Sequence, residues 1–132
     1  MIYCLDTDIL IEHFRGNVLI KEKIESLTVE DSLALSWLTL YEFFKGIFVS
    51  GKYEEEKFLQ KLVQSCIILE PTYEAAKIGG EIYAGLRKAG KLINDADIMT
   101  ASIVKAHHAV LVTNNLDHFS RIEALKTENW LK

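Results

Sequence analysis

Several features that mark other classes of protein are scarce in this sequence. Its 132 residues include one proline and two cysteines, and there is no low-complexity stretch. No apolar run approaches the roughly 18 residues that a membrane-spanning helix needs. The N-terminus lacks the charged, apolar and small-residue zones of a signal peptide. We therefore expect a cytoplasmic protein without a membrane contact, in which Cys4 and Cys66 are buried free thiols.

Basic residues are also few. Lys and Arg number 15 against 19 Asp and Glu, which leaves a formal net charge of −4 and a pI of about 5.6. Proteins that hold nucleic acid non-specifically rely on a basic surface, so the charge argues against that class. It does not exclude a nucleic-acid substrate, because a site rich in carboxylates is itself acidic and a bound cation reverses the charge locally.

The residues that are present predict a folded α/β protein. Hydrophobic residues make up 49% and charged residues 26% of the chain, which is typical of a globular protein, and the length fits one domain over residues 1–132. Apolar runs alternate with segments of helical periodicity, which favours a mainly parallel sheet. We predict strands at 2–5, 33–36, 66–69 and 110–112, helices at 8–16, 18–27, 37–49, 53–65, 73–88 and 95–106, a loop at 113–117 and a last short strand within 122–131.

Two acids, Asp6 and Asp8, directly follow the first predicted strand. Ligands of parallel sheets bind beyond the carboxyl ends of the strands, so an acid here can hold a cation. It can equally cap the helix that follows. Since one helix needs a single cap, we assign the cap to Asp8 and a metal-binding role to Asp6.

Glu42 lies in a predicted helix, 37–49, that is apolar on nearly all sides. Such a helix should be mostly covered, and a carboxylate is rarely buried without a partner. A cation at a functional site would be such a partner. The alternatives are a salt bridge, for example with Lys45, or a strip of the helix that reaches solvent.

The last predicted helix begins with Asp95 and Asp97. Acids favour the first turn of a helix because of its dipole, but two are more than capping requires. A carboxylate that the dipole keeps ionised also suits a metal. Asn115 and Asp117 follow the next strand. Asn and Asp are common in turns, so an ordinary turn can explain both residues.

These acids come from separate segments that lead to the same end of one sheet. Two unit charges about 4 Å apart repel by about 4 kcal/mol at an effective dielectric near 20, so the cluster must take up protons or bind a cation. Carboxylate oxygens favour Mg²⁺ or Mn²⁺. Zinc is not indicated, because no Cys/His pair has ligand spacing and His107 and His108 are adjacent.

Four short motifs, taken in order, carry a resemblance over essentially the whole chain. They are LDTDILI at 5–11, YEFFKG at 41–46, GKLINDADIMTAS at 90–102 and LVTNNLDHF at 111–119. In this order they resemble the PIN domain, and more narrowly the VapC-type toxins of bacterial and archaeal toxin–antitoxin pairs. The resemblance implies a three-layer α/β/α PIN-like domain with a central, mainly parallel sheet.

The resemblance also implies an activity and a set of site residues. The activity is that of a metal-dependent endoribonuclease, the toxin of a VapBC-type toxin–antitoxin system, with Mg²⁺ or Mn²⁺ as the cofactor. The family's first acid falls on Asp6, its helix glutamate on Glu42 and its third acid on Asp97. Small hydroxyl positions near the family's site fall on Thr7 and Thr113.

The sequence departs from the family pattern at one acidic position. Asn115 stands where many members have an acid directly after the Thr-x pair at the strand end. The fourth acidic role then falls to Asp117 or to Asp95, and we keep both as candidate metal ligands.

An RNA substrate also needs groups that hold its backbone. Arg87, Lys88 and Lys91 lie just before the acidic helix, although a solvated helix end explains them equally well. The resemblance further implies a cognate antitoxin that blocks the site. The segment 37–49 has more aromatic side chains than one small core needs, so part of it can pair with the antitoxin or with a second copy in a homodimer.

Two other functions compete with the nuclease. A phosphatase of the haloacid-dehalogenase type has an Asp-x-Asp motif after a strand, as at Asp6 and Asp8, but Leu10 stands where that motif has Thr or Val. The chain is also short for that fold. The other alternative is a PIN fold that only docks a partner, and the intact set of acids argues against it.

Overall fold

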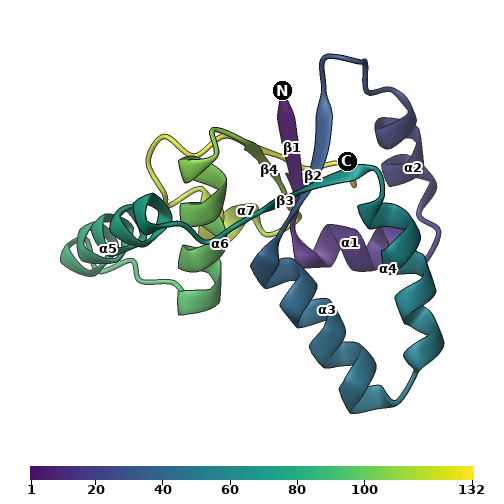
Figure 1. Ribbon diagram of the computed structural model, residues 1–132. Helices are drawn as coiled ribbons and strands as arrows, with labels where there is room; N and C mark the ends of the chain where they lie inside the picture. Colours follow the sequence, from purple (N-terminus) through teal and green to yellow (C-terminus); the bar gives the residue numbers. More distant parts are fainter.

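A five-stranded sheet forms the centre of the computed structural model, which describes residues 1–132 (Figure 1). All four strand pairings are parallel, and the strand order is β3-β2-β1-β4-β5. The strands are β1 Ile2–Leu5, β2 Ser32–Ser36, β3 Cys66–Leu69, β4 Val110–Val112 and β5 Thr127–Glu128.

Helices cover both faces of this sheet. In Figure 1 the first four helices lie on one side of the strands and the last three on the other. They are α1 Thr7–Phe14, α2 Val18–Glu25, α3 Trp37–Ser50, α4 Glu56–Val63, α5 Tyr73–Lys88, α6 Asp95–Ala106 and α7 Leu116–Phe119, with a 3₁₀ turn at Tyr53–Glu55 before α4. The predicted three-layer α/β/α fold is confirmed, and the sheet is entirely rather than mainly parallel.

The strands divide the buried side chains between two clusters. Successive residues of a strand point to opposite faces: Cys4 belongs to the cluster beneath α5 and α6, whereas Leu5 belongs to the one beneath α1, α3 and α4. Burial raises the pKa of the Cys4 thiol to about 12, and both cysteines are free. A thiol of that pKa stays protonated and behaves as a small apolar side chain.

The predicted elements differ from the structure at a few places. The segment 113–117 was expected to be a loop, but α7 begins within it at Leu116. Three of the predicted strands and the helices at 73–88 and 95–106 have the predicted bounds. No helix in the structure combines the length and the apolar character that crossing a lipid bilayer requires.

The helices α5 and α6 pack closely on one face of the sheet. A Cβ atom added at Gly79 of α5 would lie 2.8 Å from Oγ of Ser102 in α6. Ser102 is buried, and its hydroxyl donates to the carbonyl of Ile98 one turn earlier. The glycine therefore allows two helix backbones to approach at this point.

Candidate active site

Asp6 stands at the carboxyl end of the central strand β1. Its backbone N–H donates to the carbonyl of Val112 at 2.9 Å, which extends the pairing of β1 with β4. Its side chain caps α1, since Oδ1 accepts the N–H of Thr7 at 2.9 Å. The other oxygen, Oδ2, accepts the hydroxyl of the fully buried Thr113 at 2.8 Å. The carboxylate is thus held between the ends of two adjacent strands.

Asp8 points into the same region. Its Oδ1 accepts its neighbour's backbone N–H, that of Ile9, at 2.7 Å, and its Oδ2 accepts the N–H of Asn114 at 3.0 Å. The assignment of the helix cap to Asp8 is wrong, because Asp6 occupies the cap position. Asp8 instead ties the first turn of α1 to the segment after β4.

Glu42 reaches the site from the second turn of α3. The buried Ser36 begins this helix by accepting the N–H of Thr39 at 3.1 Å. The hydroxyl of Thr7 donates to Oε1 of Glu42 at 2.7 Å, which links α3 to α1. Lys45 is not its partner: the ammonium of Lys45 lies 5.4 Å from the centre of the Tyr41 ring.

Asp97 is the third residue of α6 and is largely buried, with 18% of its side chain exposed. Asn94 caps the helix by accepting the N–H of Asp97 at 2.8 Å. The carboxylate of Asp97 lies 2.7 Å from Nδ1 of His118 and within 3.5 Å of Nδ2 of Asn115. His118 is therefore part of this group of side chains.

Burial and neighbouring carboxylates raise the pKa of two acids of the site, Asp6 and Asp8. The pKa of Asp6 is raised to about 7, chiefly by burial and next by the charge of Asp8, with a smaller contribution from Asp97. Burial likewise raises the pKa of Asp8, and Asp97 adds to that shift. Hydrogen bonds from Thr113 and from the backbone oppose both shifts. These acids form a crowded, partly desolvated anionic cluster at the end of the sheet.

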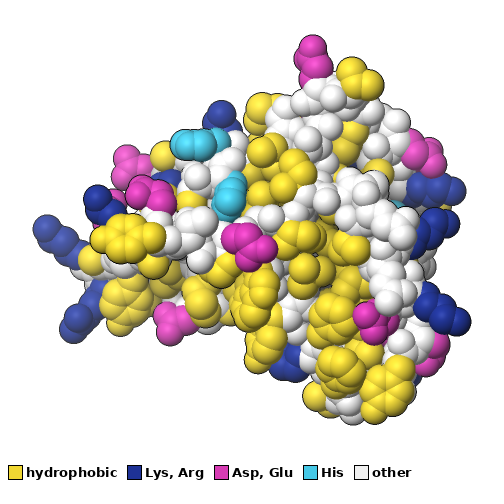
Figure 2. Space-filling view, viewed as in Figure 1, with side chains coloured by type: hydrophobic (Ala, Val, Ile, Leu, Met, Phe, Trp, Pro, Cys, Tyr) yellow, Lys and Arg dark blue, Asp and Glu magenta, His cyan; other side chains and the backbone are white.

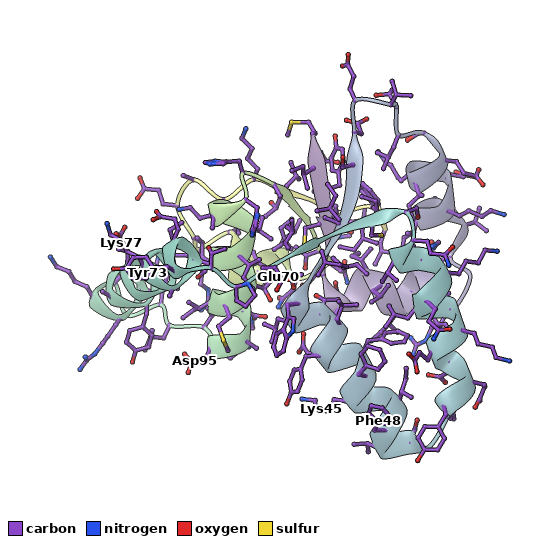
Figure 3. All side chains as sticks on the ribbon, viewed as in Figure 1. Lys45, Phe48, Glu70, Tyr73, Lys77 and Asp95 are labelled. Atoms are coloured by element: carbon purple, nitrogen blue, oxygen red, sulfur yellow. The ribbon has the colours of Figure 1, made fainter.

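The two candidates for the fourth acid do not join this cluster. Asp117 is 89% exposed, and its carboxylate lies 3.8 Å from the guanidinium of Arg121. Figure 3 shows Asp95 at the start of α6, where its side chain is exposed. Together with Met99 it lines an apolar groove. The structure instead places Asp8 beside Asp6. The sequence analysis had assigned Asp8 the role of a helix cap.

Two residues of the site were therefore missed from the sequence. Asp8 was assigned a structural role because one of two neighbouring acids had to serve as the cap. His118 drew no attention because it lies just beyond the predicted loop at 113–117, in a segment to which no helix or strand was assigned. The signal for it was the fully buried Phe119 that follows, which fixes a turn of helix at this point.

The predicted RNA-binding residues are left open by the structure. Arg87 and Lys88 belong to the exposed last turn of α5, and Lys91 follows that helix. None of the three side chains forms an ion pair, so all are free to contact an anion. Their role stays a prediction.

The side chains of the site match a divalent cation in their chemistry but not in their present spacing. No three Asp, Glu, His or Cys side chains stand close enough together to hold one ion in this structure. The chemistry of the set nevertheless fits a hard cation, since carboxylate oxygens predominate. Oδ1 of Asp97 and Oε2 of Glu42 accept no hydrogen bond from the protein. Burial is the main cause of the raised pKa of Asp6, and a cation would offset the neighbouring charges that add to it.

Comparison with known proteins gives consistent matches over the full length. Residues 3–125 match the PIN domain family. The chain is 32% identical to Ribonuclease VapC1 of Haemophilus influenzae strain R2866 over 134 residues, which cover 100% of both proteins. It is likewise 32% identical to Ribonuclease VapC2 of Rickettsia felis over 138 residues, again covering 100% of both.

Solved structures agree with the sequence matches. The structure of VapBC-1 from nontypeable Haemophilus influenzae contains a chain that superposes with a TM-score of 0.90 at 31% identity, covering 100% of both chains. That of VapBC2 from Rickettsia felis, bound to a DNA fragment from their promoter, gives 0.92 at 29% identity and covers 98% of this chain and 99% of that one. Proteins of this kind therefore share the fold of this chain.

Proposed function

This chain belongs to the PIN-domain family, among the relatives named Ribonuclease VapC, and on that basis we propose that it is a metal-dependent endoribonuclease. It would be the toxin of a VapBC-type toxin–antitoxin pair. The observation that carries the proposal is the convergence of Asp6, Asp8 and Asp97 at the carboxyl end of the sheet. There burial raises the pKa of Asp6 and of Asp8, and the charge of Asp97 adds to both shifts.

We assign the cofactor to Mg²⁺, with Mn²⁺ as a substitute. Asp6, Glu42 and Asp97 would hold it, with Asp8 in the role of the fourth acid. When bound, such an ion supplies a water of lowered pKa and neutralises charge on the phosphate. Asp95 and Asp117, which lie apart from the cluster, are not part of this assignment.

The chain's own residues orient the acids for this chemistry. Thr7 donates its hydroxyl to Oε1 of Glu42, which holds that carboxylate toward α1. Thr113 donates to Oδ2 of Asp6 and so favours its ionised form. With both carboxylates ionised, the site attracts a cation and repels an uncompensated phosphodiester. No side-chain nucleophile is required, since water is the attacking group.

The expected protein partner is an antitoxin. Both solved relatives described above are VapBC complexes, and we extend that pairing to this chain. A VapB-type antitoxin would cover the acidic site and keep the enzyme inactive. We place the protein in the cytoplasm, where its RNA substrates are, and where its two free cysteines would remain reduced.

We also propose that the protein forms a homodimer through an apolar groove of about 470 Å³. The groove runs between the start of α3 and the pair α5 and α6, and Figure 2 shows hydrophobic side chains gathered along α3 and toward this pair. Trp37, Tyr83 and Met99 line it and are each 41–49% exposed. Exposed apolar surfaces of this kind typically mark interfaces.

The test of the proposed function is cleavage of RNA by the purified chain. Structured RNAs are incubated with Mg²⁺, with Mn²⁺ or with EDTA, and the variants Asp6→Ala and Asp117→Asn are compared with the unaltered protein. We expect cleavage that needs the metal, is lost in Asp6→Ala and persists in Asp117→Asn. The control is matched because Asp117 is an exposed acid outside the cluster.

Other results would overturn the assignment. Cleavage that continues in EDTA would exclude the metal-dependent mechanism. A folded, antitoxin-free sample that neither binds Mn²⁺ nor cleaves any RNA would favour the docking module. A phosphorylated enzyme labelled on Asp6 would favour the phosphatase.

A further inference from the structure

His118 lies beside the acidic cluster and contacts one of its members. Nδ1 of His118 is 2.7 Å from Oδ2 of Asp97, and the two side chains are 35% and 18% exposed. A carboxylate can only accept a hydrogen bond, so Nδ1 is the donor in this contact. The bond joins α7 to α6, two helices that β4 separates in the sequence.

Every protein side chain that donates to the Asp97 carboxylate reaches the same oxygen. Nδ2 of Asn94 lies 3.1 Å and Nδ2 of Asn115 lies 3.5 Å from Oδ2, and His118 makes the shortest of the three contacts. Oδ1 has no hydrogen-bond partner. The carboxylate is therefore held by one oxygen while the other is left for a ligand.

The fold fixes His118 in this place. Phe119, the next residue, is 1% exposed and belongs to the same buried cluster as Ile98 and Ala101 of α6. The backbone N–H of Phe119 donates to the carbonyl of Asn115 at 3.3 Å, which closes the short turn of α7. The imidazole cannot leave Asp97 by a movement of α7 without disturbing that core. Its Nε2 makes no hydrogen bond within the protein.

We propose that His118 is a positioning residue for Asp97, whose Oδ2 it holds so that Oδ1 is oriented toward the divalent cation. The proposal rests on the proposed function and deepens it, because it assigns a role to a residue that is neither an acid nor a ligand. Groups that hydrogen-bond to the ligands of a metal typically change its affinity 10–100-fold.

The test measures binding of Mn²⁺ alone to the purified full-length chain, with free Mn²⁺ followed by electron paramagnetic resonance. His118→Leu removes the donor and keeps a side chain of similar size. His118→Asn keeps an N–H donor near the position of Nδ1. We expect Mn²⁺ to bind about 10-fold or more weakly to His118→Leu and to regain most of its affinity in His118→Asn.

A matched control is available at the other end of α6. Nε2 of His107 lies 3.0 Å from the carbonyl oxygen of Glu70, so His107→Leu also replaces a histidine and removes one hydrogen bond. We expect this variant to bind Mn²⁺ as the unaltered protein does. Equal weakening in His107→Leu and His118→Leu would overturn the proposal, since the effect would then be one of general stability.

A kinetic measurement separates positioning from direct contact with RNA. If His118 acts only through Asp97, the activity lost in His118→Leu returns at saturating Mn²⁺, and His118→Asn cleaves nearly as well as the unaltered protein. A loss of kcat that persists at saturating Mn²⁺ in both variants would assign Nε2 to the substrate and overturn the proposal.

Failure of this inference can be told from failure of the proposed function. The Asp6→Ala variant is titrated with Mn²⁺ beside the His118 variants. If Asp6→Ala loses Mn²⁺ while His118→Leu binds it normally, only the role of His118 is wrong. If Asp6→Ala binds Mn²⁺ normally, the metal site itself is wrong and this proposal falls with it.

Discussion

Asp6 carries out two tasks that one residue seldom combines. It caps α1 through Oδ1 and faces Asp8 and Asp97 within the acidic cluster. Burial and the neighbouring charges raise its pKa from an ordinary 3.8 to about 7. Without a cation, the folded protein therefore favours the protonated form of this residue below about pH 7, whereas binding of a metal requires the ionised form.

This pKa predicts how the stability of the metal-free protein depends on pH. Because the folded state binds the Asp6 proton more tightly than the unfolded state, the stabilisation is complete below about pH 4 and is lost as the pH rises through about 7. The loss is at most about 4 kcal/mol. Urea unfolding in EDTA should thus give a lower free energy of unfolding at pH 8 than at pH 5.

The variant Asp6→Asn isolates the contribution of this residue. It cannot ionise, so we expect a smaller fall in the free energy of unfolding between pH 5 and pH 8, with Asp8 accounting for part of what remains. Asp117→Asn serves as the control, because that acid is 89% exposed. If Asp6→Asn and the unaltered protein show the same fall, the raised pKa is wrong.

At the level of single residues, sequence reasoning found the acids but could not divide their roles. Asp6, Glu42 and Asp97 were selected from the sequence, and their roles as metal ligands stay a prediction. The cap was assigned to Asp8 because a sequence does not distinguish the roles of two acids separated by one residue. Only the backbone direction after β1 shows that Asp6 occupies the cap position while Asp8 accepts the N–H of Asn114.

Among the elements, α5 and α6 show the tightest contact, at Gly79 and Ser102. In the unaltered protein, Gly79→Ala places a Cβ 2.8 Å from the Ser102 hydroxyl, which must then leave the carbonyl of Ile98. We expect this cost to cancel or exceed the gain of up to about 1 kcal/mol in helix propensity.

The double variant supplies the comparison. In a Ser102→Ala background the nearest atom is gone, and Gly79→Ala should raise the melting temperature through its helix propensity. Thermal unfolding of the four proteins measures the coupling between the two positions. An identical effect of Gly79→Ala in both backgrounds would show that the hydroxyl does not restrict the approach of the helices.

The elements themselves were largely predictable, for reasons that differ among them. The strands at Ile2–Leu5, Cys66–Leu69 and Val110–Val112 are short apolar runs with clear breaks on both sides. The long helices repeat their apolar residues over several turns. Leu116–Phe119 has a single turn, too short for any periodicity, so α7 could be found only through the burial of Phe119.

For the whole molecule, the apolar groove predicts a homodimer that a single substitution in the groove should dissociate. Met99 lines the groove and is 48% exposed, so Met99→Glu would bury an unpaired charge in a dimer but leave a monomer unharmed. We expect light scattering to give a dimer for the unaltered protein and a monomer for this variant. Val29→Glu, at a fully exposed loop residue, should stay dimeric; a monomeric unaltered protein would refute the interface.

The charge of the whole molecule predicts how RNA binding responds to salt. The chain is acidic overall. Attraction to RNA phosphates is therefore expected from individual basic side chains, such as Arg87, and not from the net charge. In an Asp6→Ala background, which prevents cleavage, Arg87→Gln should weaken RNA binding and reduce the slope of log affinity against log salt by about 0.7. An unchanged slope would remove Arg87 from the interface.

The position of β1 in the sheet has a consequence for the synthesis of the protein. Tyr3 pairs with Val110, and the Thr113 hydroxyl that holds Asp6 is 107 residues away in the sequence. Strand β1 can therefore pair with β4 only after the ribosome has made most of the chain. This takes roughly 5–20 s at about 5–20 residues per second. A nascent chain has no assembled acidic site during that interval, so the translating ribosome that produces it is not exposed to its activity.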